Sequence, residues 1–377
     1  MIPAGEASAR QAFRLGRKAK NMRIKPVVLC VCAAASAALE AAMTPEWSAM
    51  LVKVRSTLDG TEQPCYFWSP EKAKSDAVPL VVGLHTWSGN YKHTNHYGTV
   101  LEYAKKSGWA FVGPDFRGAN DKPTACGSDY AVQDIVDAVS YAKANAKIDA
   151  ARIYIVGGSG GGHITLLMLG RHPELFAAGA AFCPISDLAR WHADSLEDHP
   201  GRGKCYAEMM EKSCGGTPAE RPWEYALRSP LTWLGRARDA GVPAYICTGI
   251  HDGWRGSVPV GHSIRAYNAL ADAADRVSEA DIASIERNQA VPPSLAAAGG
   301  SPPPEARRKG APDPFYGESR RIHLRLTSAN VRLTLFEGGH DGNYAAGFDF
   351  LSRQRKGRPA DWTIPAQGSG DSRALTK

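Results

Sequence analysis

A serine between glycines, Ser159, offers the clearest chemistry in this sequence. It stands in the segment Gly157-Gly158-Ser159-Gly160-Gly161, which joins an apolar run to a helix-like run. Flanking glycines permit the sharp, strained turn that exposes a nucleophilic hydroxyl, and the start of a helix favours negative charge nearby. The segment lacks the third glycine of a dinucleotide loop and the Lys-Ser/Thr pair of a phosphate loop. The pattern predicts Ser159 as a nucleophile.

A serine hydroxyl needs a base, and the base needs a third group that orients it. His340 lies in a glycine-flanked loop after the last clear strand-like run, and we predict it as the base. Asp252 follows the apolar run Tyr245–Thr248 and is the predicted orienting acid. Asp187 is the alternative acid, with a helix cap as its other interpretation. The order serine, aspartate, histidine is that of the α/β-hydrolase group.

An oxyanion hole requires backbone N–H groups that point at the developing negative charge. The N–H of Gly160, directly after the nucleophile, is one candidate. The second donor is expected in the segment His85-Thr86-Trp87-Ser88-Gly89, from Trp87 or Thr86. We interpret His85 as a residue that supports this loop.

Strands and helices alternate along the chain and must position these groups. Strands are predicted at Leu51–Thr57, Cys65–Trp68, Pro79–Leu84, Trp109–Gly113, Ile153–Val156, Ala177–Cys183, Ala244–Thr248 and Val331–Phe336. Helices are predicted at Thr99–Ser107, Tyr130–Ala146, from Ile164 onward, at His262–Ala274 and at Ala345–Arg353. An antiparallel hairpin followed by strand–helix units predicts an α/β fold with a mostly parallel, twisted sheet and helices on both faces.

The sequence predicts one large domain behind a leader. Residues 1–37 combine a long basic region with a short apolar stretch and small residues, the pattern of a secretory signal; Met22 is an alternative start. Residues 38–377 then form a single α/β-hydrolase domain. Within it, residues 186–240 lack strand patterning and suggest a lid, and residues 276–318 form a Pro-, Ala- and Gly-rich excursion. We expect export to the periplasm or the cell exterior.

Charge and composition narrow the functional classes. The chain has 377 residues and a formal net charge of +7, nearly all of it in residues 1–37. The body is almost neutral, so no nucleic-acid partner is expected. No apolar run is long enough for a membrane span. Six cysteines lie after residue 37, of which Cys205 and Cys214 are close enough to form a small loop and Cys183 and Cys247 look like buried thiols. No metal or organic cofactor is expected.

Several segments together give the chain a family likeness. They are HTWSG at 85–89, PDFRG at 114–118, GGSGGG at 157–162, CPISDL at 183–188, the Asp252 loop with Val258-Pro259, and GGHDG at 338–342. With them, residues 48–355 resemble the catalytic domain of prolyl-oligopeptidase-like (S9-type) α/β-hydrolases. The resemblance implies a catalytic triad of Ser159, Asp252 and His340, and a mainly structural role for Asp115 and Arg117.

The resemblance leaves the substrate open. Full oligopeptidases carry a β-propeller that restricts access, and too few residues precede the first strand here to form one. We therefore expect a carboxylesterase, with acetyl or feruloyl esters on polysaccharides as candidate substrates. Tryptophans expected near the rim, Trp191, Trp223 and Trp254, are candidates for stacking on sugar or aromatic rings, or for packing the lid. The alternatives are a peptidase acting on short peptides and a non-catalytic binding protein on a hydrolase scaffold.

Overall fold

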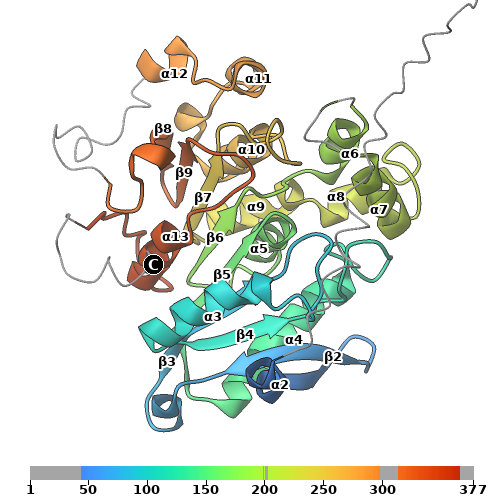
Figure 1. Ribbon diagram of the computed structural model, residues 1–377, viewed down its shortest axis with the longest axis vertical. Coiled ribbons are helices and arrows are strands. Elements are labelled where there is room, and N and C mark those ends of the chain that lie inside the picture. Colours follow the sequence, from blue (N-terminus) through green and yellow to red (C-terminus); the bar gives the residue numbers. More distant parts are fainter. Residues whose placement is uncertain (1–43, 198, 200–202, 298–312, 366–377) are drawn as a thin grey trace, which may run out of the picture.

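The chain folds around one nine-stranded sheet (Figure 1). The computed structural model describes residues 44–365 except 198, 200–202 and 298–312. The strand order is β1-β2-β4-β3-β5-β6-β7-β9-β8. Neighbours from β4 to β9 run parallel, whereas β1, β2 and β8 pair antiparallel. This is the predicted α/β-hydrolase fold class, with an antiparallel strand at the far edge in addition to the opening hairpin.

The elements follow each other in a largely alternating order. The strands are β1 Leu51–Arg55, β2 Glu62–Trp68, β3 Val78–Leu84, β4 Ala110–Pro114, β5 Ile148–Gly158, β6 Ala178–Phe182, β7 Ala244–Gly249, β8 Ile322–Ser328 and β9 Val331–Phe336. The helices are α2 Pro45–Met50, α3 Asn95–Ser107, α4 Asp129–Asn145, α5 Gly160–Arg171, α6 Leu188–Leu196, α7 Lys204–Cys214, α8 Pro222–Arg228, α9 Pro230–Asp239, α10 Gly261–Leu270, α11 Glu279–Asn288, α12 Pro293–Ala297 and α13 Tyr344–Arg353.

Side chains alternate across the central strands and build a core on each face of the sheet. In β3, Leu80 and Val82 join the core shared with α4, α5, α9 and α10, whereas Val81 joins the core shared with α2, α3 and α13. In β5, Ile155 and Tyr154 divide between the two cores in the same way. A period of two on strands buried on both faces explains why these runs are continuously apolar. Helices therefore cover both faces, as predicted.

The predicted elements agree with the structure except at a few boundaries. The strand β8 was not predicted; its residues do not alternate strictly in burial, since Leu324 and the neighbouring Arg325 are both buried. Helix α5 begins at Gly160, directly after the candidate nucleophile, and not at Ile164. Helix α10 ends at Leu270, four residues before the predicted end.

The two irregular stretches contain helices. The first stretch contains α6, α7, α8 and α9, of which α6 to α8 lie together at one side of the sheet (Figure 1). A small core of their own joins Leu188 and Met210 to Trp87 and Val258. The second stretch contains α11 and α12. The single-domain and lid interpretations stay predictions.

The predicted signal, residues 1–37, lies outside the described residues. Among the helices that the structure describes, none is both long enough and apolar enough to cross a bilayer.

Candidate active site

The predicted triad residues follow three strands at the carboxyl edge of the sheet. Ser159 comes directly after β5, Asp252 follows β7, and His340 follows β9. In the sheet, β5, β6, β7 and β9 are consecutive neighbours and parallel. Their carboxyl ends therefore open on one edge, where open α/β sheets place ligand sites.

Ser159 occupies a strained turn. Its φ is 56° and its ψ is −119°, a conformation that L-residues other than glycine rarely adopt. The backbone holds it there: Ser159 N donates to Phe182 O at 2.8 Å, and Ser159 O accepts from His163 N at 2.9 Å. Strain of this kind persists only where the surroundings enforce it, and it is typical of functional residues. The turn has the form expected of a nucleophile elbow.

His340 and Asp252 form a direct pair. The Nδ1 atom of His340 lies 2.9 Å from each carboxylate oxygen of Asp252. The carboxylate also accepts hydrogen bonds from Thr248 Oγ1 at 3.0 Å and from Gly253 N at 2.9 Å. Asp252 is 2% exposed, whereas the His340 side chain is 22% exposed. The acid is thus buried and held by several donors, and the imidazole reaches the open side.

A tight backbone approach locks this pair. A Cβ atom on Gly256 would lie 2.2 Å from His340 Cβ and 2.5 Å from Asp252 Oδ1, so only glycine fits there. The His340 N–H donates to Arg255 O at 3.1 Å, which fastens the histidine loop to the same segment.

The charged form of His340 is favoured in this environment. Burial opposes the imidazolium, but the carboxylate of Asp252 and the sulfur of Cys183 outweigh it and raise the pKa of His340 well above 6.5. An imidazole with a raised pKa is a stronger base, which suits removal of a hydroxyl proton.

The Ser159 hydroxyl has no hydrogen bond to His340 among those found in the described residues. Catalytic hydrogen bonds in unliganded enzymes are often long and shorten when substrate binds. Indirect contacts link the two loops: Ser159 N bonds to Phe182 O, and the ring of Phe182 lies 4.5 Å from the ring of Tyr344, four residues after His340.

The oxyanion candidates lie against each other. A Cβ atom on Gly160 would lie 2.3 Å from Trp87 N, so the backbones of Gly160 and Trp87 are in close contact. Among the hydrogen bonds of the described residues, none has Trp87 N as donor. The Thr86 carbonyl accepts from Gly89 N at 3.1 Å, which closes the turn that carries Trp87. This arrangement fits Trp87 N–H and Gly160 N–H as the two donors better than Thr86.

His85 supports the loop that carries Trp87. It is fully buried, its ring stacks on Phe116, and its nitrogens lie 2.8 Å from Thr86 O and 2.7 Å from Asp115 O. Burial lowers the pKa of His85 to about 4, so it stays neutral at physiological pH. This agrees with the structural interpretation of the residue.

Asp187 caps a helix. Its carboxylate accepts from Arg190 N at 3.1 Å at the start of α6, and the described residues show it no histidine partner. The helix-cap interpretation of this residue is therefore confirmed.

Arg117 pairs with acids other than Asp115. It bonds to Asp134 at 2.6 Å and to Asp59 at 2.8 Å. The Asp115 carboxylate instead accepts from Tyr91 N at 2.6 Å. Both residues therefore fasten loops, and neither is part of the candidate site.

The three tryptophans predicted near the rim have different positions. Trp191 is 1% exposed, packs edge-on against Trp87 at 4.6 Å between ring centres, and donates to Ser257 O. Trp191 therefore packs in the small core formed by α6 to α8, in agreement with the packing interpretation and not with the stacking one. Trp223 and Trp254 are 59% and 40% exposed. The indole N–H of Trp254 donates to Glu286 O at 2.7 Å.

Sequence reasoning missed the supporting groups Thr248 and Gly256 and the neighbour Cys183. The Cys183 sulfur, one carboxylate oxygen of Asp252 and one ring nitrogen of His340 lie within 4.8 Å of one another. Its place directly after β6, between the strands of the nucleophile and the acid, was the available signal. No disulfide joins Cys205 to Cys214, so the small loop considered for them is not closed, and none of the six cysteines in the described residues forms a disulfide.

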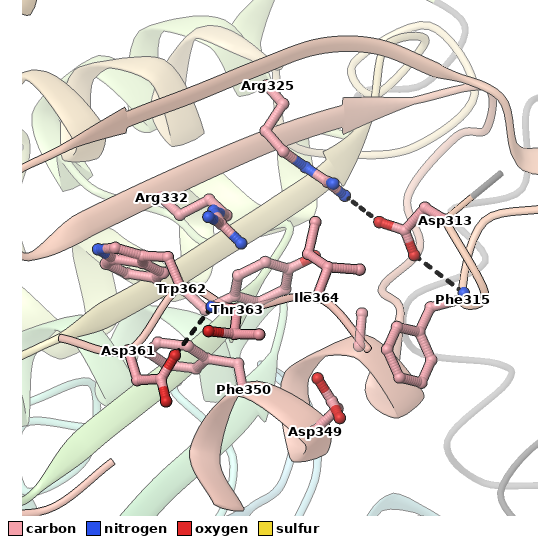
Figure 2. Close-up of a pocket in the computed structure, with 12 residues that line it drawn as sticks. Asp313, Phe315, Arg325, Arg332, Asp349, Phe350, Asp361, Trp362, Thr363 and Ile364 are labelled. Atoms are coloured by element: carbon pink, nitrogen blue, oxygen red, sulfur yellow. Dashed lines mark hydrogen bonds and ion pairs between the residues drawn. The ribbon is translucent and has the colours of Figure 1, made fainter. Parts of the chain in front are cut away.

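Two cavities border the strands and helices at the C-terminal end of the chain. A cavity of about 20 Å³ is lined by Tyr245, Arg332 and Phe350, among others, near the amino ends of β7 and β9 and away from the triad. Figure 2 shows Arg332 and Phe350 among the residues that line it. This cavity is large enough for about one water molecule and no substrate. A larger hollow of about 850 Å³ borders the histidine loop at Gly342 and Tyr344 and continues along α3.

Comparisons with known proteins show which family the chain resembles. The family described as "Prolyl oligopeptidase family" matches residues 90–286. Dipeptidyl aminopeptidase BIII of Pseudoxanthomonas mexicana is 29% identical over 227 residues, 56% of this chain and 31% of that protein. Feruloyl esterase B of Neurospora crassa is 29% identical over 128 residues, 32% of this chain and 44% of that protein. The chain thus spans less than half of the length of either relative.

Among solved structures, the uncomplexed Pyrococcus horikoshii acylaminoacyl peptidase is similar, with a TM-score of 0.45 and 20% identity over 58% of this chain and 34% of that one. The family match covers more than half of the chain and includes both the Ser159 turn and Asp252. The chain therefore belongs to the prolyl oligopeptidase family of serine hydrolases.

Proposed function

We propose that this protein hydrolyses carboxylic esters through an acyl-enzyme on Ser159. The observation that carries the proposal is the pair formed by the buried Asp252 and the partly exposed His340, 2.9 Å apart, on the same sheet edge as the strained Ser159 turn. These groups supply a nucleophile, a base and the residue that orients the base.

In the first half-reaction, Ser159 Oγ attacks the ester carbonyl while its proton moves to His340 Nε2. Asp252 accepts a hydrogen bond from His340 Nδ1, which fixes the tautomer and stabilises the imidazolium. The N–H groups of Gly160 and Trp87 bind the oxyanion, a contribution of about 3 kcal/mol per donor. His340 then gives its proton to the alkoxide oxygen, and the alcohol leaves.

In the second half-reaction, water takes the place of the alcohol. His340 removes a proton from the water as it attacks the acyl carbonyl, and Ser159 leaves with that proton. The acid product departs and the starting state returns. Every proton passes through the same ring nitrogen, so no step needs a group beyond these residues.

Esters are proposed ahead of amides because an alkoxide is a better leaving group than an amide anion, so amide cleavage depends more strongly on protonation of the leaving nitrogen. Ester cleavage requires only the nucleophile, base and donors described above. The similarity to a feruloyl esterase and the exposed Trp223 and Trp254 support polysaccharide-linked acetyl or feruloyl esters as substrates. Export, inferred from residues 1–37, would bring the enzyme to such polymers.

Peptide cleavage is the second candidate. It is supported by the similarity to a dipeptidyl aminopeptidase and to acylamino-acid-releasing enzyme 1 of Oryza sativa, which is 27% identical over 218 residues, 54% of this chain and 26% of that protein. The same triad would serve, with His340 giving its proton to the amine.

The test compares wild type and Ser159→Ala on p-nitrophenyl acetate, acetylated xylan, methyl ferulate and an aminoacyl-prolyl amide. We expect ester turnover in wild type, its loss by about 10⁶-fold in the variant, and little amide cleavage. Amide cleavage at comparable efficiency would replace the ester proposal by the peptidase. Failure of wild type to react with a fluorophosphonate probe would favour a non-catalytic binding protein.

A further inference from the structure

The edge that carries the triad also carries a thiol that the proposed mechanism does not use. Cys183 follows β6, the strand between the nucleophile's β5 and the acid's β7. It has a φ of 39°, and its N–H donates to Cys247 O at 2.9 Å, so its backbone is fixed. Its exposed fraction is 4%. The sulfur is thus held close to the His340–Asp252 pair.

We propose that Cys183, His340 and Asp252 form an inhibitory site for a soft divalent cation, with Zn²⁺ as the best match. Their sulfur, nitrogen and oxygen atoms lie within 4.8 Å of one another. This set of donors, with a fourth position left open, is one that Zn²⁺ prefers. The inference rests on the proposed function, because it concerns regulation of the same site.

The geometry needs only a small adjustment. Tetrahedral Zn²⁺ with the usual bond lengths separates its ligand atoms by about 3.3–3.6 Å. The His340 Nδ1–Asp252 distance of 2.9 Å must open slightly, and the sulfur must approach. The partly exposed His340 ring gives the cation a route from solvent.

Inhibition follows from the tautomer of His340. In the active form, Nδ1 carries the hydrogen that Asp252 accepts, and the lone pair of Nε2 is free to take the Ser159 proton. A cation on Nδ1 uses the lone pair of that nitrogen, so the ring hydrogen must sit on Nε2. The thiol of Cys183 loses its proton to solvent as the sulfur binds. With Nε2 occupied by hydrogen, His340 no longer acts as a base.

The activity test is a Zn²⁺ titration of p-nitrophenyl acetate hydrolysis by wild type, Cys183→Ser and Cys205→Ser. Each protein is compared with its own rate in a chelator. We expect EDTA-reversible inhibition of wild type and of Cys205→Ser, which keeps Cys183 and removes a half-buried thiol of α7. Cys183→Ser should need at least about ten-fold more Zn²⁺ for the same inhibition, because the thiolate that binds the metal directly is lost. Equal sensitivity of Cys183→Ser and wild type would overturn the proposal.

A binding measurement separates this proposal from the proposed function. Co²⁺ added to Ser159→Ala protein should produce a thiolate-to-metal charge-transfer band and intense visible bands of four-coordinate Co²⁺. The bands should persist in Ser159→Ala/Cys205→Ser and disappear in Ser159→Ala/Cys183→Ala. Absence of a thiolate band in Ser159→Ala would refute the site whether or not the protein hydrolyses esters. If the Co²⁺ bands appear in Ser159→Ala but the wild-type protein hydrolyses no ester, only the proposed function is refuted and the metal site stands.

Discussion

The two halves of the candidate triad are positioned by different means. The nucleophile half depends on backbone: Ser159 is held at positive φ by main-chain hydrogen bonds, and Gly160 touches the backbone of Trp87. The acid–base half depends on side chains: Asp252 accepts hydrogen bonds from Thr248, the Gly253 N–H and His340, which is 88 residues away. A backbone turn is visible in the sequence as a local pattern of glycines, whereas the side-chain network joins residues that are far apart in the sequence. The two halves should therefore fail differently when altered.

We expect the largest loss of activity when the negative charge of Asp252, in the acid–base half, is removed. Asp252→Asn keeps the shape but replaces an acceptor by an amide that favours the wrong tautomer of His340. We expect kcat to fall by about 10⁴-fold. Steady-state kinetics on p-nitrophenyl acetate measures the loss, and circular dichroism checks the fold. A folded Asp252→Asn variant within ten-fold of wild type would remove Asp252 from the triad.

A smaller but still large effect is expected from distorting the backbone half. In Gly160→Ala, the added Cβ would lie 2.3 Å from Trp87 N, so the two oxyanion candidates must move apart. We expect kcat to fall by about 10²–10³-fold, as for loss of an oxyanion donor. The matched control is Gly235→Ala in α9, where an added Cβ meets nothing within 4 Å and should leave kcat unchanged. Comparable rates for both variants would contradict the placement of the oxyanion hole.

Removing one hydrogen bond from the network around Asp252 should lower kcat moderately. Thr248→Val removes the hydroxyl that donates to Asp252 Oδ2 at 3.0 Å and preserves the side-chain shape. Because two other donors remain, we expect a fall in kcat of about ten-fold, the equivalent of one hydrogen bond to a charged group. Thermal unfolding and kcat are measured together. An unchanged kcat would show that Thr248 serves packing alone.

The smallest change concerns pH. Because the pKa of His340 is raised above 6.5, the free enzyme loses its base as the pH falls through a value higher than 6.5. The acid limb of kcat/KM should therefore lie above pH 6.5, and in Asp252→Asn it should move to lower pH. The same shift stabilises the folded protein fully below the unfolded-state pKa, and this contribution is lost as the pH rises through the folded-state pKa. A wild-type limb at or below 6.5 would contradict the raised pKa.

The backbone half was more accessible from sequence than the side-chain half. The glycines around Ser159 indicate a turn within five residues, and the apolar runs of β5, β7 and β9 have lengths and compositions typical of buried strands. The placement of Asp252 and His340 needed the order of strands, which the fold class supplied. Gly256 and Cys183 were missed because each matters through its contact with His340, a distant part of the chain, which no local pattern records. Thr248 is only four residues from Asp252, but no motif indicates that its hydroxyl donates to that carboxylate. Strand β8 was missed because it is an edge strand in which His323 and Arg325 stand between the apolar residues, so it is not a continuous apolar run.

The contact between Trp87 and Trp191 has an optical consequence. Two indoles 4.6 Å apart and steeply inclined, at 78°, couple their electronic transitions and contribute a paired band to circular dichroism. One indole belongs to the loop of the oxyanion donors and the other to α6, and both are buried. The pair is thus a built-in reporter: acylation that shifts the Trp87 loop, or opening of α6, would alter this band without any added label.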